Sequence, residues 1–89
     1  MTSLRAVVRG MVQGVGFRFY AERSARALGV RGWVRNRADG SVESYAEGEE
    51  EAVAEYVRRL ERGPAGSRVD GVEVEPADPT GVDAFEVRR

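Results

Sequence analysis

Residues 10–20 have the sequence GMVQGVGFRFY, and the change of pattern within this stretch decides the fold. Before it, apolar and arginine side chains alternate along residues 4–12, as in a strand with one buried face. After it, Phe17 and Leu28 share one helical face, and Gly29 is typical of a helix end. The glycines between the two patterns predict a tight loop that joins a strand directly to a helix.

The remaining segments complete a recognisable order of elements. We expect a strand, a helix, two strands, a second helix, a strand and a short last strand, over residues 4–12, 17–29, 30–36, 41–47, 49–64, 69–76 and 85–89. In the strand over residues 69–76, Val72 and Val74 are expected to point inward. This order predicts one α+β domain over residues 1–89 with the ferredoxin-like fold, a split βαβ sandwich (βαββαβ plus the short last strand). Both helices are expected on one face of an antiparallel sheet.

The topology brings two distant segments together. In this fold the first two strands run parallel with the third between them, so their C-terminal ends lie at the same edge of the sheet. The loop after the first strand and Asn36 at the end of the second should therefore be neighbours, although 18 positions separate Arg18 from Asn36.

Composition restricts the chemistry that the chain can perform. It contains neither cysteine nor histidine, which excludes disulfides, thiolate nucleophiles and imidazole bases. No apolar run approaches the ~20 residues of a membrane span, and the N-terminus has no leader-like apolar segment, so we expect a cytoplasmic protein. Residues 1–38 carry a charge of +7 and residues 39–89 a charge of −8. The first half either forms a positive field that attracts anions or is neutralised by interleaving with the second.

The glycine loop predicts an anion site. Glycines let several N–H groups at a helix start point at one oxyanion. Arg18 lies in the first helical turn, where a cation opposes the helix dipole unless an anion joins it. A nucleotide P-loop would need lysine followed by serine or threonine, and a dinucleotide fingerprint would need glycine at Phe19. A small phosphate or carboxylate therefore fits best; the alternative is a plain turn in which glycine serves packing.

Two longer stretches carry a family resemblance. VRGMVQGVGFR (residues 8–18) and GWVRNRADGSVESYAEG (residues 32–48) closely resemble the two signatures of the acylphosphatase family. Weaker similarity continues through Gly63-Pro64 and the C-terminal FEVR, so the resemblance covers essentially the whole chain. The family often has a second proline where this chain has Ala65, a position distant from the expected site.

The resemblance implies a fold, an activity and a set of residues. It implies hydrolysis of acyl phosphates to a carboxylate and inorganic phosphate by a small cytosolic enzyme, without metal, cofactor or covalent intermediate. Arg18 would bind the phosphate as the catalytic arginine, and Asn36 would orient the attacking water. The backbone cradle for the substrate would be formed by Gln13, Gly14, Val15, Gly16 and Phe17. Inorganic phosphate or sulfate would bind as a product-like ligand, and we expect a monomer with no membrane or nucleic-acid partner.

Other functions stay open from the residues themselves. A non-catalytic regulatory module with this fold would bind an anion without releasing phosphate. An acylphosphatase-like domain can also head a larger hydrogenase-maturation protein, whose cysteine-rich segments this sequence lacks. Nucleic-acid binding is supported only by the arginine-rich first half.

Overall fold

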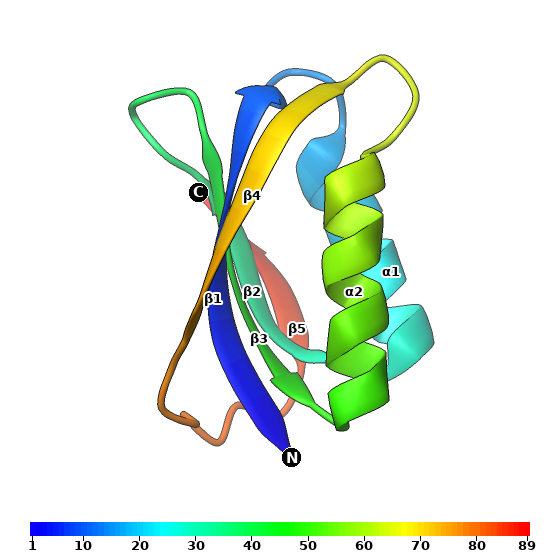
Figure 1. The fold of residues 1–89 in the computed structure, drawn as a ribbon, viewed down its shortest axis with the longest axis vertical. Helices are drawn as coiled ribbons and strands as arrows, with labels where there is room; N and C mark the ends of the chain where they lie inside the picture. The colour runs from blue at the N-terminus through cyan, green and yellow to red at the C-terminus, as the bar shows by residue number, and fades with distance from the viewer.

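The computed structural model describes residues 1–89 as two helices packed on one face of a five-stranded sheet (Figure 1). The elements are, in chain order, β1 (Thr2–Met11), α1 (Phe17–Leu28), β2 (Arg31–Asn36), β3 (Val42–Gly48), α2 (Glu50–Arg62), β4 (Arg68–Pro76) and β5 (Phe85–Arg88). The ferredoxin-like order predicted from the sequence is confirmed. Neither helix is long and apolar enough to cross a membrane.

The sheet has the strand order β4-β1-β3-β2-β5, with antiparallel pairing of β1 to β3 and β4 and of β2 to β3. β1 and β2 therefore run in the same direction and end at the upper edge of the sheet in Figure 1. The expectation of an antiparallel sheet is wrong for the last strand. β5 pairs in parallel with β2, so the sheet is mixed. The reason is geometric: β4 ends at the lower edge, so a chain that crosses the sheet there must return upward along β2.

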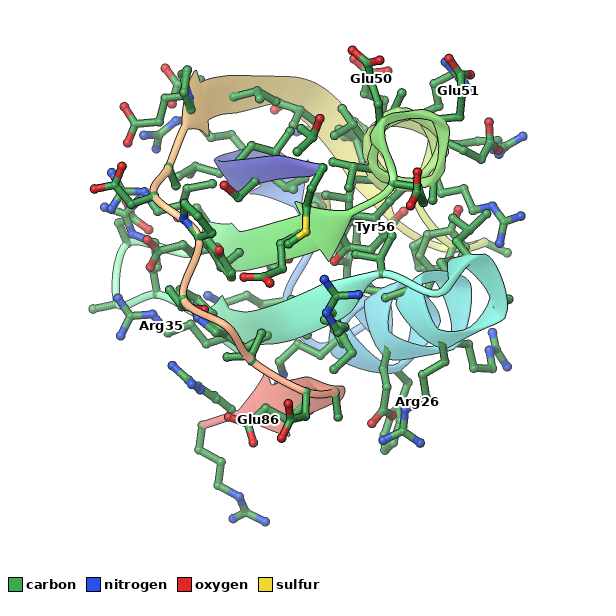
Figure 2. The ribbon with its side chains drawn as sticks, turned by 90° about the horizontal axis from the view of Figure 1, so that it is seen from below. Arg26, Arg35, Glu50, Glu51, Tyr56 and Glu86 are labelled. Atoms are coloured by element: carbon green, nitrogen blue, oxygen red, sulfur yellow. The ribbon has the colours of Figure 1, made fainter.

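α2 packs against the sheet through three buried side chains. Val53, Tyr56 and Leu60 recur at helical spacing and are at most 1% exposed. Figure 2 shows Tyr56 between α2 and the sheet, with Glu50 and Glu51 on the outer side of the helix. Burial of each such large side chain contributes about 1.5–3 kcal/mol to stability, which fixes the helix on the sheet.

α1 packs beside α2 and begins at the loop singled out in the sequence. Its buried face consists of Phe17, Ala21, Ser24 and Ala25. Tyr20 is half-buried, and its hydroxyl donates to the carbonyl oxygen of Arg59 in α2 at 2.8 Å. Packing of this face and the hydrogen bond to α2 therefore hold the start of α1 in a fixed place above the sheet.

β4 is less buried than its valines suggested. Val72 packs against the core, but Val74 is 46% exposed, so the prediction that both are buried is wrong for Val74. β4 is an edge strand, with β1 as its only neighbour in the sheet. Val74 pairs with Ala6 of β1 and has no strand on its other side to cover it.

The outer face of the sheet carries interleaved charges. Arg5 and Arg35 lie 3.6 and 2.7 Å from the carboxylate of Glu43, and Arg9 lies 3.0 Å from Glu73. The exposed pair of Arg9 and Glu73 contributes at most about 1 kcal/mol, whereas the carboxylate of Glu43 is buried beneath its two arginines. Together these ion pairs neutralise much of the arginine-rich first half with acids of the second half, as one of the two sequence-based alternatives predicted.

The connection over residues 77–84 is anchored at the lower end of the sheet (Figure 1). Glu47 is 1% exposed and accepts hydrogen bonds from the hydroxyl of Tyr45 at 2.6 Å and from the N–H of Thr80 at 3.1 Å. The Tyr45 hydroxyl, with a smaller contribution from the Thr80 N–H, lowers the pKa of Glu47 to about 2. This anchor fixes the start of β5, whose far end reaches the candidate site.

Candidate active site

The β1–α1 loop leaves a row of backbone N–H groups without acceptors. Gly16 occupies the N-cap of α1, with no side chain to cap the helix, and the first turn contains no acid. The first backbone hydrogen bond at this end runs from the Tyr20 N–H to the Gly16 oxygen at 3.0 Å. The N–H groups of residues 14–19 donate no hydrogen bond within the chain. Free amides and the positive end of the helix dipole together attract an anion.

The two loop glycines are required by backbone conformation. Gly14 and Gly16 both have φ of 76°, in the left-handed region that other residues adopt at a cost of roughly 1–2 kcal/mol. A Cβ atom added at either position would meet no heavy atom within 4 Å. Packing therefore does not explain these glycines, and the open space beside them is available to a ligand.

Gln13 fastens the loop to the β2–β3 hairpin. Its side-chain nitrogen donates to the carbonyl oxygens of Arg37 at 2.7 Å and Ser41 at 3.0 Å. Within that hairpin, Asp39 accepts from both the hydroxyl and the N–H of Ser41, which lowers the pKa of Asp39. The Gln13 side chain is thus engaged in positioning the loop.

Arg18 is the half-buried cation of the first helical turn, and no carboxylate neutralises it. Every arginine except Arg18, Arg23 and Arg89 lies within 4.0 Å of an acidic oxygen. One Arg18 nitrogen, Nη1, donates to the carbonyl oxygen of Arg88 in β5 at 3.1 Å. A guanidinium has five N–H donors, so this bond orients the group and leaves donors for an anion.

Asn36 ends β2 and lines the same groove as Gly14, Gly16 and Arg18. The groove has a volume of about 880 Å³. The Asn36 side chain takes part in no hydrogen bond within the chain. The expectation that the loop and Asn36 are neighbours is therefore confirmed, and an amide able to donate and accept lies beside the cation.

The side chains of three expected loop residues belong mainly to the fold. The side chains of Gln13 and Val15 do not line the groove; Val15 packs against the core. Phe17 lines it, although its side chain is only 2% exposed and belongs mainly to the core. These three residues can offer backbone groups to a ligand, but their side chains serve the fold.

Five groove residues were not anticipated from the sequence: Val12, Phe19, Glu22, Val87 and Arg89. Glu22 could have been found, because it follows Arg18 by one helical turn. Glu22 is paired with Arg26, whose Nη2 lies 3.0 Å from its carboxylate. Val87 and Arg89 come from β5 and the residue after it, which the parallel pairing with β2 brings to the groove.

Comparisons of sequence and structure show which known proteins the chain is similar to. The family model for acylphosphatase matches residues 4–87. An acylphosphatase of Anaeromyxobacter dehalogenans is 56% identical over 94% of this chain and 91% of its own length. One of Moorella thermoacetica is 48% identical over 99% of this chain and 97% of its own. The crystal structure of the acylphosphatase from Bacillus subtilis has a TM-score of 0.97 at 37% identity, covering both chains completely. The chain therefore belongs to the acylphosphatase family of hydrolases.

Proposed function

We propose that the chain hydrolyses acyl phosphates to a carboxylate and inorganic phosphate in the groove between the β1–α1 loop and Asn36. The observation that carries the proposal is the guanidinium of Arg18, which has no carboxylate partner and adjoins the free N–H groups of residues 14–19. Membership of the acylphosphatase family supports the same class of substrate.

In the proposed reaction, the oxygen of a water molecule forms a bond to phosphorus as the bond from phosphorus to the acyl oxygen breaks. The carboxylate leaves with the electron pair of that bond. Because a carboxylate is a weak base, its departure needs no proton from the protein. The transferred phosphoryl group spreads negative charge over its three equatorial oxygens, so catalysis can depend on positioning and charge stabilisation.

The groove residues divide these tasks. The N–H groups of residues 14–17 hold the equatorial oxygens at the positive end of α1, and Arg18 adds a planar pair of donors. The amide oxygen of Asn36 accepts a hydrogen bond from the water and orients it for in-line attack. We assign the water's proton to a phosphoryl oxygen, since Glu22, the one acid that lines the groove, is paired with Arg26.

The proposal extends to the state and place in which the enzyme works. We propose that the enzyme acts as a monomer, as the sequence predicts. We propose a cytoplasmic location, as the sequence predicts, and no nucleic-acid or membrane partner.

A hydrolysis assay with acetyl phosphate in EDTA tests the proposal. We expect Arg18→Ala and Asn36→Ala each to lower kcat/KM by about 10²–10³, the effect of removing one donor or orienting group. Arg23→Ala is the matched control, because Arg23 is an exposed arginine of α1 that lacks an acidic partner and lies outside the groove. A wild-type protein that binds phosphate but releases none from acetyl phosphate would be the non-catalytic module. Wild-type turnover by folded Arg18→Ala would disprove the role of Arg18.

A further inference from the structure

Glu22 lies on α1 between two arginines at the same spacing. Arg18 precedes it by four residues and Arg26 follows it by four, so the three side chains share one face of the helix. The carboxylate of Glu22 lies 3.0 Å from Nη2 of Arg26, and Arg18 has no carboxylate partner. One acid therefore has two possible cations, and it is paired with the one that lies outside the groove.

The choice of partner matters because Glu22 lines the same groove as Arg18. Its side chain is only 20% exposed, so the carboxylate is close to the wall of the groove. A carboxylate paired with Arg18 would occupy guanidinium donors that a phosphoryl group needs, and it would place a negative charge beside the anion. An anion site with an acid in its wall therefore needs another group to hold that acid.

Two contacts hold Arg26 in place. Besides the pair with Glu22, its Nη2 donates to the carbonyl oxygen of Phe85, the first residue of β5, at 3.3 Å. Figure 2 shows Arg26 on the side of α1 where β5 lies. The order of charges favours the same pairing, because an acid pairs better with a cation four residues after it than with one four residues before it. Arg18 is directed to the other end of β5, where its Nη1 donates to the carbonyl oxygen of Arg88 at 3.1 Å.

Resting on the proposed function, we infer that Arg26 is a positioning residue that keeps Glu22 away from Arg18 and so leaves Arg18 free to bind the phosphoryl group. Arg26 does not line the groove, and it acts through Glu22. Without Arg26, the cation that remains at helical spacing on this face of α1 is Arg18. Glu22 then competes with phosphate for the same guanidinium. Binding weakens, whereas the chemical step, which follows the displacement of Glu22, is retained.

Calorimetry with inorganic phosphate and hydrolysis of acetyl phosphate in EDTA test the inference in Arg26→Ala and in Arg26→Ala/Glu22→Gln. We expect Arg26→Ala to raise the Kd of phosphate and the KM of acetyl phosphate roughly 3- to 10-fold, the effect of one competing ion pair and one added charge nearby. Its kcat should stay within about twofold of the wild-type value, because only binding is affected. The double variant should restore Kd and KM, since a neutral amide does not compete as an anion. Both variants lack the contact with Phe85, so their difference isolates the carboxylate of Glu22.

Two further variants separate the charge of Arg26 from its packing. Arg26→Lys keeps a cation four residues after Glu22, so its Kd and KM should stay close to those of the wild type. Arg58→Ala is the matched control, because Arg58 is an exposed arginine that lies 2.8 Å from Glu55 on α2 and outside the groove. Both constants should equal those of the wild type in this control.

The outcomes separate the role of Arg26 from the activity. Wild-type Kd and KM in Arg26→Ala overturn the inference and leave the proposed function intact. Losses that the double variant does not recover, or an equal loss in Arg58→Ala, also overturn it, because the effect would then not pass through Glu22. The expected changes in Kd without any hydrolysis by the wild type support the role of Arg26 at the anion site and disprove the proposed function. If the wild type neither binds phosphate nor hydrolyses acetyl phosphate, both are wrong.

Discussion

Gln13→Ala would remove the clamp between the β1–α1 loop and the β2–β3 hairpin. The variant loses two hydrogen bonds, to the carbonyl oxygens of Arg37 and Ser41, of 2.7 and 3.0 Å. Each contributes about 0.5–1.5 kcal/mol net, or roughly 2 kcal/mol together. At 1.4 kcal/mol per factor of ten, the population with an ordered cradle falls by up to about 30-fold. We expect a loss of kcat/KM for acetyl phosphate on the order of 10-fold, since both loop glycines and the start of α1 are unchanged.

Steady-state kinetics and denaturant unfolding together decide this prediction. Ser3→Ala is the matched control, because it deletes one side-chain bond, from the Ser3 hydroxyl to the Ala77 oxygen at 2.6 Å, at the opposite end of the sheet. It should lower the free energy of unfolding by about 1 kcal/mol without affecting kcat/KM. The reasoning is refuted if Gln13→Ala, folded under the assay conditions, hydrolyses acetyl phosphate as well as the wild type does.

Three other variants test separate parts of the account. Gly16→Ala should lower the free energy of unfolding by about 1–2 kcal/mol, because the φ of Gly16 is 76°. Gly71 has equally open space beside it and no positive φ, so Gly71→Ala should change the free energy of unfolding by at most about 0.5 kcal/mol. Equal losses in the two variants would contradict the conformational argument. Glu22→Gln should retain most of kcat, and a fall of about 10² or more would instead make Glu22 a general base. The pKa of Glu47, lowered by the Tyr45 hydroxyl to about 2, predicts stability that is present above pH 4.5 and is lost as the pH falls towards 2. Unfolding measured across that range should show a weaker acid dependence in Glu47→Gln than in the wild type, because Asp39, whose pKa is also lowered, still contributes to it.

Local patterns were sufficient to predict the part of the site that lies on β1, α1 and β2. The alternation before Gly10 and the helical spacing after Gly16 indicated the strand, the loop and the helix. The handedness of the two crossovers then placed Asn36 beside the loop, because consecutive parallel strands end at one edge. Neither step required knowledge of long-range side-chain contacts.

The contribution of β5 could not be predicted in the same way. A four-residue strand carries no signal of its partner, and only the crossing of residues 77–84 makes it run beside β2. The sequence therefore did not predict that Val87 lines the groove, nor that the carbonyl oxygen of Arg88 orients Arg18. Both are consequences of tertiary pairing over long sequence distances.

The burial of β3 also could not be predicted from the sequence. All seven residues of this strand are buried, including Glu43 and Glu47, although acids in a strand usually indicate a solvent-facing side. Arginines of the neighbouring strands cover Glu43, and the segment that contains Thr80 covers Glu47. The pattern of one strand does not reveal what its neighbours place over it.

Titration with inorganic phosphate, followed by NMR of the backbone amides, tests the central claim most directly. We predict a single saturable curve in which the amides of residues 14–19 shift most and the guanidinium of Arg18 shifts with them. Arg18→Ala should weaken this binding by roughly tenfold or more, the effect of losing charge-assisted hydrogen bonds. Amides 14–19 that do not respond, or shifts that gather instead around Arg5 and Arg9 on the outer face of the sheet, would contradict the claim.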